Sequence, residues 1–396
     1  MAASIFEREK ELFLPTYTRI PIKITHGKGV HLFDDKGNKY LDFFSGLAVN
    51  ALGYAHPKIE EAVCSQISKF AHLSNKYITD VQIEFAELLL KYSGMSKIFM
   101  CNSGTESVEA AIKLVRKKYG PDKKIFSLKN GFHGRTYGSL TLTEKEKYKK
   151  GFEPFLPNIS KIIFNDIDDL TNKASNDTAA IFLEFMQGEG GINIISEEFI
   201  LTLKELREKY KFAVVADEIQ SGIGRTGKPF AYNHFDFLPD IVASAKAIGG
   251  GLPLGAVLTS PGFDNVLESG KHGTTFGGNP VSCAAGKVVL EEVFENGLMN
   301  NAKELGSYFI EQLKELQKLF PGDIKEVRGK GFMIGVELFY EGDKIVEQMR
   351  RKKVLTNCTS GNVLRILPPL IAGRSEIDFF LYNFHEVLKS SSNGKR

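Results

Sequence analysis

The sequence contains no run of about 18 apolar residues, the length that a membrane-spanning helix needs. The N-terminal stretch MAASIFEREKELFLPTY carries charges where a secretory signal would need an apolar core. The four cysteines form no CxxC pair, and the eight histidines show neither an HExxH nor an HxH pattern. These absences predict a cytoplasmic protein with reduced thiols, no metal site and no membrane partner.

An excess of either charge is also missing. The chain has 51 basic and 48 acidic residues, which gives a net charge of +3. Basic runs such as residues 350–353 are typical of solvated faces, so the balance argues against a nucleic-acid partner. A hydrophobic content of 42% and a charged content of 25% are typical of a globular protein, and 396 residues predict two or three folding units.

Short apolar runs alternate with amphipathic stretches through the middle of the chain, which predicts an α/β fold with a mostly parallel sheet. We expect strands within residues 97–104, 123–130, 179–186, 212–216 and 241–245. We expect helices at residues 57–72, 80–92, 105–120, 197–210, 280–296, 300–319 and 375–390. Hairpins are expected at residues 30–43 and 324–338.

These patterns divide the chain into two domains. Residues 51–280 hold most of the strand and helix alternation, and we assign them to a large domain. Residues 281–396 combine helices with a hairpin and predict a smaller α+β domain. Residues 1–50, which begin with a polar helix, are expected to form an N-terminal segment of that small domain.

Two buried strands in residues 213–255 end in charged side chains. The first apolar run ends at Asp217 and the second at Lys246. Ionised groups in a dry site cost free energy unless they are paired or chemically occupied. Doubly wound α/β sheets place ligands beyond the carboxyl ends of their strands. We therefore interpret Asp217 and Lys246 as two oppositely charged residues of one cofactor site.

Two further segments could complete such a site, and each has a simpler interpretation. Ser103, Gly104 and Thr105 precede a helix whose N-terminus could bind a phosphate, although Ser and Thr also serve as ordinary helix caps. In the Phe132-His133-Gly134-Arg135 loop, the ring could stack on a cofactor and the guanidinium could grip a carboxylate. The alternative is a half-buried Phe132 beside a surface Arg135.

The acidic and basic candidates also have simpler interpretations. Glu184 and Glu189 flank a strand end, where either could be a solvated acid. Asp217 could cap a helix, and Lys246 could extend along the surface. Their common order along the chain is what favours one shared site.

Several motifs together resemble the class III (subgroup II) pyridoxal-phosphate aminotransferases. They are FHGRT, QGEGG, DEIQSGIGRTG, SAKAIGGGLPLGA, HGTTFGGNP and RGKGFMIG, and the likeness extends from about Thr16 to Leu370. This resemblance implies a fold-type I enzyme with a large, seven-stranded type of sheet and a smaller α+β domain. It also implies a pyridoxal 5'-phosphate cofactor and a homodimer whose subunits share their active sites.

Carried over position by position, the resemblance assigns roles to individual residues. Lys246 and Asp217 would be the catalytic residues, with Lys246 holding the cofactor covalently and Asp217 on its pyridine nitrogen. Phe132 would stack on the ring, and Gln220 would lie beside the ring hydroxyl. The remaining expected cofactor-binding residues are Gly104 and Thr105 at the phosphate, Thr275 of the partner subunit at the same phosphate, and His133 and Glu184.

Within the class, the stretches SGLAVNALGYAHP, HGTTFGGNP and NVLRILPPL resemble the acetylornithine aminotransferases. This implies transfer of the terminal amine of N2-acetyl-L-ornithine to 2-oxoglutarate, as in arginine biosynthesis. Arg135 would hold the α-carboxylate of the donor, and Arg365 that of glutamate or 2-oxoglutarate. Glu189 would mask Arg365 while the donor is bound, and Thr274 would be a further substrate-binding residue.

Some positions depart from the family pattern and leave alternatives open. Phe185 and Met186 follow Glu184, Ala216 precedes Asp217, and residues 107–108 read Ser-Val. The substrate could therefore be N-succinylornithine, N-succinyl-diaminopimelate, ornithine or 4-aminobutyrate. A racemase or decarboxylase of the same fold would not need both Glu189 and Arg365. A nucleotide-binding protein is supported only by GIGRTG, which does not open an amphipathic helix.

Overall fold

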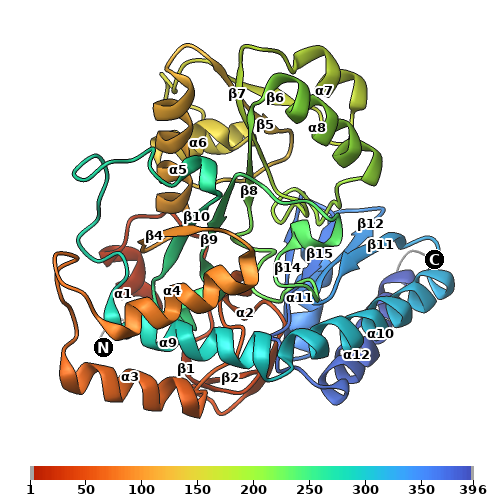
Figure 1. The fold of residues 1–396 in the computed structure, drawn as a ribbon. Helices are drawn as coiled ribbons and strands as arrows, with labels where there is room; N and C mark the ends of the chain where they lie inside the picture. The colour runs from red at the N-terminus through yellow and green to blue at the C-terminus, as the bar shows by residue number, and fades with distance from the viewer. Residues whose placement is uncertain (1–3, 394–396) are drawn as a thin grey trace.

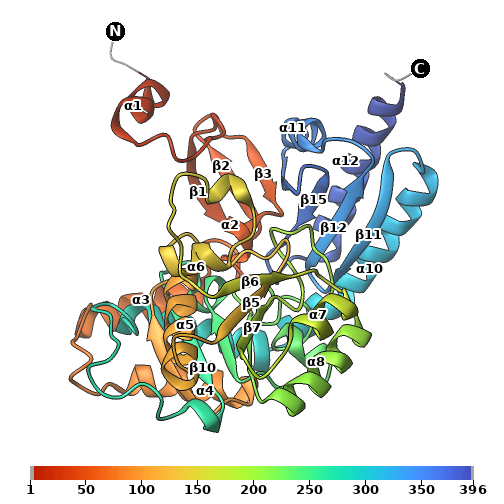
Figure 2. The same cartoon turned by 90° about the horizontal axis from the view of Figure 1, so that it is seen from above.

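The computed structural model describes residues 4–393 (Figures 1 and 2). Its centre is a seven-stranded sheet with the order β4-β10-β9-β8-β7-β5-β6. The strands are β4 (Lys97–Cys101), β5 (Lys124–Leu128), β6 (Ile159–Ile162), β7 (Thr178–Leu183), β8 (Ala213–Asp217), β9 (Ile241–Ser244) and β10 (Gly255–Thr259). Only β10 runs antiparallel to its neighbours, β4 and β9, so the mostly parallel sheet expected from the sequence is confirmed.

Helices cover both faces of this sheet. The main ones are α3 (Pro57–Lys69), α4 (Asp80–Ser93), α5 (Gly104–Tyr119), α6 (Tyr137–Leu142), α7 (Ile167–Lys173), α8 (Glu197–Tyr210) and α9 (Pro280–Leu290). Successive residues of β8 enter two different apolar clusters. Val214 packs in the cluster that includes α8, and Val215 packs in the one that includes α5. Burial on both faces explains why these strands read as continuous apolar runs.

Two four-stranded sheets lie beside the large sheet. One has the order β1-β2-β3-β13, from β1 (Ile24–Lys28), β2 (His31–Asp34), β3 (Lys39–Asp42) and β13 (Val354–Leu355). The other has the order β11-β12-β15-β14, from β11 (Ile324–Lys330), β12 (Met333–Leu338), β15 (Val363–Ile366) and β14 (Asn357–Thr359). Both expected hairpins, β2–β3 and β11–β12, are confirmed as antiparallel pairs.

The remaining helices are α1 (Ile5–Leu12), α2 (Ser45–Ala48), α10 (Leu298–Leu319), α11 (Asp343–Arg351) and α12 (Arg374–Asn393). Figure 1 shows α10 and α12 side by side next to the sheet of β11 and β12, and their residues are in contact. No helix within residues 4–393 is long and apolar enough to cross a membrane.

The contacts between distant segments bear on the predicted division into domains. β13 pairs with β3 in parallel, so an N-terminal segment and a C-terminal one share a sheet. α9 packs against α3 and α4, which favours grouping it with the large domain rather than with the residues after it. The boundaries at residues 50 and 280 stay predictions.

Candidate active site

A cavity of about 270 Å³ opens where β7, β8 and β9 end and α5 begins. Ten of the residues predicted from the sequence line it: Gly104, Thr105, Phe132, His133, Arg135, Glu184, Glu189, Asp217, Gln220 and Lys246. Gly134 and Ile219 complete the lining. The parallel strand order brings these residues together, since it places the carboxyl ends of neighbouring strands at one edge.

Asp217 lies at the end of β8 and is buried. One carboxylate oxygen, Oδ2, lies 2.8 Å from Nδ1 of the buried His133. The other, Oδ1, accepts a hydrogen bond of 3.1 Å from the backbone N–H of Ile219. The second ring nitrogen of His133, Nε2, is buried without a partner among the described residues. The imidazole and the backbone together fix the direction of the Asp217 carboxylate.

Glu184 follows β7 and anchors two loops. Its carboxylate accepts backbone hydrogen bonds from Phe132 at 3.0 Å and from Gly188 at 2.9 Å. Burial, together with the nearby charge of Asp217, raises the pKa of Glu184 to about 7. Glu184 therefore holds the loop that carries Phe132 against the loop that leads to Glu189.

Lys246 follows β9 in an uncommon backbone conformation. Its φ is +54°, in the left-handed region that side chains other than glycine rarely adopt. Burial lowers the pKa of its amine, and the positive charge of Arg365 lowers it further. A lowered pKa increases the fraction of free amine, which is the form that acts as a base or nucleophile.

The N-terminus of α5 faces the cavity through Gly104 and Thr105. The Ser103 side chain caps the helix by accepting a 3.4 Å hydrogen bond from the Glu106 N–H. A Cβ on Gly104 would lie 2.7 Å from the side chain of Ile219, so only glycine fits there. The backbone N–H groups at the start of a helix favour a bound anion, and this end of the cavity suits a phosphate.

Arg365 and Glu189 form an ion pair at the other end of the cavity. Nη1 of Arg365 lies 2.6 Å from Oε1 of Glu189. Arg365 also donates to Asn357 Oδ1 at 3.1 Å and to Gln220 Oε1 at 3.3 Å. Burial alone would raise the pKa of Glu189, but the guanidinium beside it outweighs burial and lowers that pKa. The pair is therefore ionised at neutral pH.

The backbone around Glu189 is held more firmly than its side chain. Its carbonyl oxygen accepts hydrogen bonds from Lys145 Nζ at 2.8 Å, Thr359 Oγ1 at 2.6 Å and Ser360 Oγ at 3.2 Å. The carbonyl of Gly191 accepts further bonds from Arg328. A change of partner for the Glu189 carboxylate therefore needs only side-chain rotation.

Three predicted residues do not line the cavity. One is Arg365, which contacts the lining residues Glu189 and Gln220. The others are Thr274 and Thr275. Thr274 Oγ1 accepts a 2.9 Å hydrogen bond from Asn102 Nδ2, and Thr274 lines a separate, smaller cavity. Thr275 is exposed on the same loop, beside Phe276, which is 59% exposed. This chain therefore does not bring Thr274 or Thr275 into its own cavity.

Sequence reasoning missed several residues at the site. Ile219 lies in the DEIQ motif, between the predicted site residues Asp217 and Gln220. Its side chain is apolar, so the sequence does not distinguish it from a residue of the hydrophobic core. Lys145 lies in the charged run TEKEKYKK, which is typical of a solvated face. No local pattern marks a lysine whose amine reaches a carbonyl on a distant loop.

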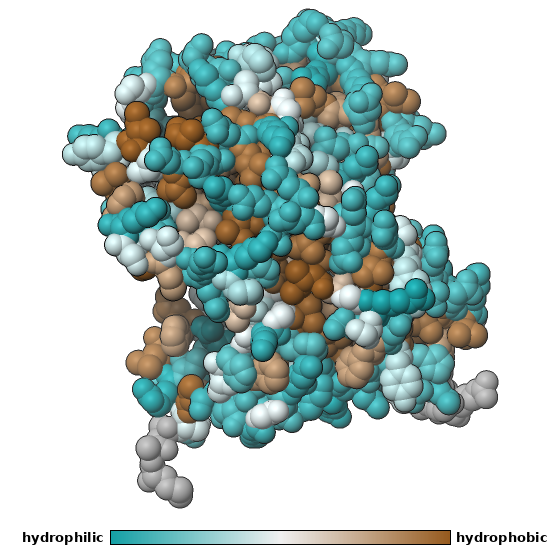
Figure 3. Space-filling model, turned by 60° about the horizontal axis from the view of Figure 1, so that its bottom comes forward, coloured by the Kyte–Doolittle hydropathy of each residue, from teal (hydrophilic) through white to brown (hydrophobic). Residues whose placement is uncertain are grey.

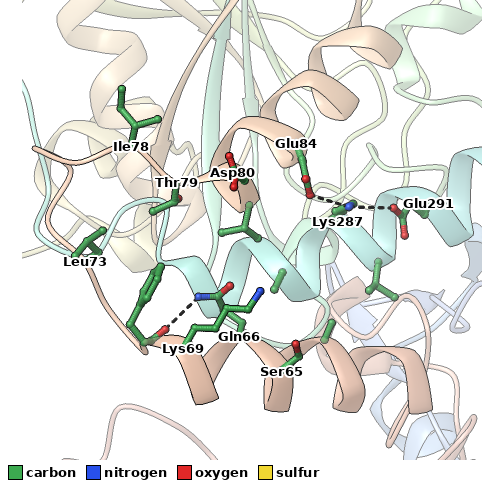
Figure 4. A pocket seen from close by; sticks show the side chains of 15 residues that line it. Ser65, Gln66, Lys69, Leu73, Ile78, Thr79, Asp80, Glu84, Lys287 and Glu291 are labelled. Atoms are coloured by element: carbon green, nitrogen blue, oxygen red, sulfur yellow. Dashed lines mark hydrogen bonds and ion pairs between the residues drawn. The ribbon is translucent and has the colours of Figure 1, made fainter.

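A second cavity, of about 600 Å³, lies between α3, α4 and α9 (Figure 4). Its charged groups are largely paired with one another: Lys287 Nζ lies 2.8 Å from Glu84 and 3.7 Å from Glu291. It contains none of the predicted site residues. Among residues 4–393 no cluster of three potential metal ligands occurs.

Comparison with known proteins places the chain in a family. Residues 13–388 match the model of the class-III aminotransferases. The chain is 47% identical over 378 residues to the acetylornithine aminotransferase of Aquifex aeolicus, a match covering 94% of this chain and 98% of that one. It is 44% identical over 386 residues to the acetylornithine aminotransferase of Caldanaerobacter subterraneus, covering 96% and 98%.

Solved structures of similar shape come from two kinds of aminotransferase. The acetylornithine aminotransferase of Elizabethkingia anophelis is 32% identical with a TM-score of 0.87, covering 97% of this chain and 98% of that one. The ornithine aminotransferase of Toxoplasma gondii is 29% identical with a TM-score of 0.94, covering 98% and 95%. In crystals of that enzyme grown with oxidised glutathione, pyridoxal phosphate partly occupies the active site. This chain therefore belongs to the class III aminotransferases, a family of pyridoxal-phosphate-dependent transaminases.

Proposed function

We propose that this enzyme is an acetylornithine aminotransferase, which transfers the terminal amine of N2-acetyl-L-ornithine to 2-oxoglutarate. The products are N-acetylglutamate 5-semialdehyde and L-glutamate. The observation that carries the proposal is the Glu189–Arg365 ion pair, whose Glu189 lines the same cavity as Lys246 and Asp217. Relatives with this activity, 40 to 47% identical over nearly the whole chain, support the choice of donor.

The residues of the cavity fit pyridoxal 5'-phosphate. Asp217 offers a fixed carboxylate for a protonated ring nitrogen, and Lys246 offers an amine for the aldehyde. Phe132 offers an aromatic face, and the start of α5 at Gly104 and Thr105 offers N–H groups to the phosphate. Gln220 would lie beside the ring hydroxyl. When bound, the cofactor supplies an electron sink for the pair left on a substrate carbon that loses a proton.

Two residues would carry the chemistry. Asp217, held by His133 and the Ile219 N–H, would keep a proton on the ring nitrogen. Lys246 would be the base, because burial lowers the pKa of its amine and favours the free form. Its Nζ would accept the proton that leaves the donor carbon, and the same amine would act in the second half-reaction.

Glu189 and Arg365 would sort the two substrates. While N-acetylornithine is bound, the ion pair hides Arg365, so the donor carboxylate goes to Arg135 instead. Glutamate and 2-oxoglutarate carry a second carboxylate that displaces Glu189 from Arg365. One cavity can then accept two differently shaped substrates in turn, because the charge of Arg365 is masked while N-acetylornithine is bound.

A second copy of the chain would complete the site. Thr275 and Phe276 are exposed on a loop outside this chain's own cavity. Large apolar side chains are also exposed at Ile67, Tyr77 and Ile78, and Ile78 lines the cavity of Figure 4. Figure 3 shows a different view, where hydrophobic patches interrupt a mainly hydrophilic surface. We expect a homodimer in which Thr275 of the partner subunit reaches the phosphate and Thr274 lies near the substrate.

A half-reaction panel tests the proposal. The cofactor-loaded enzyme is mixed separately with N-acetylornithine, N-succinylornithine, N-succinyl-diaminopimelate, ornithine, 4-aminobutyrate and glutamate, without an acceptor. The change in cofactor absorbance is followed. Fast conversion by N-acetylornithine and glutamate alone is the expected result. Preference for another donor would move the substrate assignment while leaving the cofactor and its residues in place.

A further inference from the structure

Arg135 is exposed at the edge of the active-site cavity and is held by aromatic rings alone. Its Cζ lies 3.6 Å from the centroid of the Tyr148 ring and 5.6 Å from that of Phe132. Within residues 4–393 its guanidinium makes no hydrogen bond and no ion pair. Its N–H donors are therefore all available to a ligand.

Tyr148 is the nearer of the two rings that contact Arg135. It ends the short 3₁₀ turn Glu146–Tyr148, is half-buried, and does not belong to the described residues that line the cavity. Its ring meets the Phe132 ring edge to face, with the centroids 6.0 Å apart and the planes at 83°. The Phe132 loop is anchored in turn by Glu184. The ring of Tyr148 therefore packs against Phe132, whose backbone is held by Glu184.

The stacked geometry suits recognition of a carboxylate. A guanidinium donates its hydrogen bonds in its own plane, so an aromatic ring on one face leaves the donor fork free. The ring also restricts a side chain that would otherwise sample many rotamers, and a preorganised arginine binds more tightly. Lys147 is the other cation near this ring, but its Nζ lies farther away, at 5.1 Å.

We propose that Tyr148 is a positioning residue for donor recognition, holding Arg135 in the orientation that binds the α-carboxylate of the amino donor. The inference rests on the proposed function for the identity of that donor. Glutamate has a further carboxylate for Arg365, so the contribution of Tyr148 is read most directly with the donor, whose carboxylate depends on Arg135. The aromatic ring of Tyr148, and not its hydroxyl, is the group that holds Arg135.

A binding experiment tests the contact without turnover. The cofactor-loaded wild type, Y148F and Y148L are titrated calorimetrically with N2-acetyl-L-norvaline, which has the α-carboxylate and the acetyl group but no terminal amine to react. We expect Y148L to raise Kd by about 3- to 30-fold, the range of a cation–π contact, and Y148F to stay near wild type. An unchanged Kd in Y148L, or an equal loss in Y148F, overturns the proposal.

Half-reactions show whether the effect belongs to the donor carboxylate. With N-acetylornithine, Y148L should need a donor concentration about 3- to 30-fold higher for the half-maximal rate, at a limiting rate close to wild type. With N-acetyl-1,4-diaminobutane, which lacks the carboxylate, Y148L should match wild type. A matched control is Tyr210→Leu, which removes a tyrosine beside Lys209 far along α8 and should change neither half-reaction.

Failure of the proposed function would look different from failure of this inference. If the wild type converts ornithine or 4-aminobutyrate but not N-acetylornithine, the donor assignment is wrong, and the same comparison of Y148L with Y148F is made with that donor. An equal loss with N-acetyl-1,4-diaminobutane would mean that Tyr148 only supports the fold, and would overturn the inference.

Discussion

The two ends of the active-site cavity differ in how their charged groups are held. At the cofactor end, Asp217 and Glu184 follow adjacent parallel strands, and each accepts hydrogen bonds from the backbone of a neighbouring loop. At the substrate end, Arg365 comes from β15 of a different sheet, and it pairs with Glu189 on a loop. The cofactor end is fixed by backbone contacts, whereas the substrate end is joined by side chains.

This difference follows from what each end has to do. A cofactor that stays bound through every cycle needs charges that do not move, and backbone hydrogen bonds at strand ends supply them. Two substrates that alternate need a charge that can be masked and released. A side-chain ion pair between two sheets can exchange partners without disturbing either sheet.

The largest expected effect comes from the cofactor end. Lys246→Ala should abolish turnover in both half-reactions, because it removes the amine that holds the cofactor and moves the proton. The measurement is the cofactor absorbance of the purified variant, followed by both half-reactions. Measurable turnover in Lys246→Ala would remove this residue from the centre of the mechanism.

A second substitution at the cofactor end should slow both half-reactions without abolishing them. Asp217→Ala removes the carboxylate proposed to face the ring nitrogen, and we expect a loss of about 100- to 1,000-fold in each half-reaction. Asp168→Ala, at an exposed position of α7, is the matched control and should behave like wild type. A near wild-type rate in Asp217→Ala would contradict its role as the ring partner.

A substitution at the substrate end should slow the two half-reactions by different factors. Arg365→Ala should slow the glutamate half-reaction by about 10- to 100-fold, the loss of a charge-assisted hydrogen bond or two, and affect the N-acetylornithine half much less. Single-turnover rates against concentration for each substrate give the measurement. Equal losses in both halves would rule out the masking role of Glu189.

The smallest expected effect comes from His234, which does not line the cavity. Burial, together with the positive charge of Lys330, lowers the pKa of His234 to about 4 from its ordinary 6.5. Between these values the unfolded chain binds a proton that the folded chain does not, so the free energy of unfolding falls as the pH falls, by about 1–3 kcal/mol.

His234→Gln tests this, because glutamine can still bond to Thr226. The difference in unfolding free energy between wild type and variant should shrink or reverse from pH 7 to pH 4.5 in urea titrations. A difference that stays constant across this window would contradict the prediction. The balance between the two half-reactions should not change.

Much of the cofactor end could be predicted from the sequence, since its charges directly follow apolar runs that form buried strands. That pattern predicts Asp217 and Lys246 as site residues, and the parallel sheet places both at one cavity. The substrate end depended on the family resemblance. No local pattern shows that Arg365 on β15 meets a loop 176 residues earlier in the chain.

The same limit applies to elements that the sequence did not reveal. β10 is a five-residue strand after a glycine-rich loop, and its antiparallel position between β4 and β9 depends on long-range pairing. β13 has two residues and exists only through its pairing with β3. Tyr148 looks like part of a solvated charged run until its ring is seen on Arg135.

The three donors on the Glu189 carbonyl have a consequence for speed. Side-chain rotations take picoseconds to nanoseconds, whereas loops that open and close move more slowly, up to the millisecond range of lid motions. Because the backbone of Glu189 is pinned by Lys145, Thr359 and Ser360, exchanging substrates requires only the fast kind of motion. We therefore expect that the proposed Glu189 switch does not limit the turnover rate.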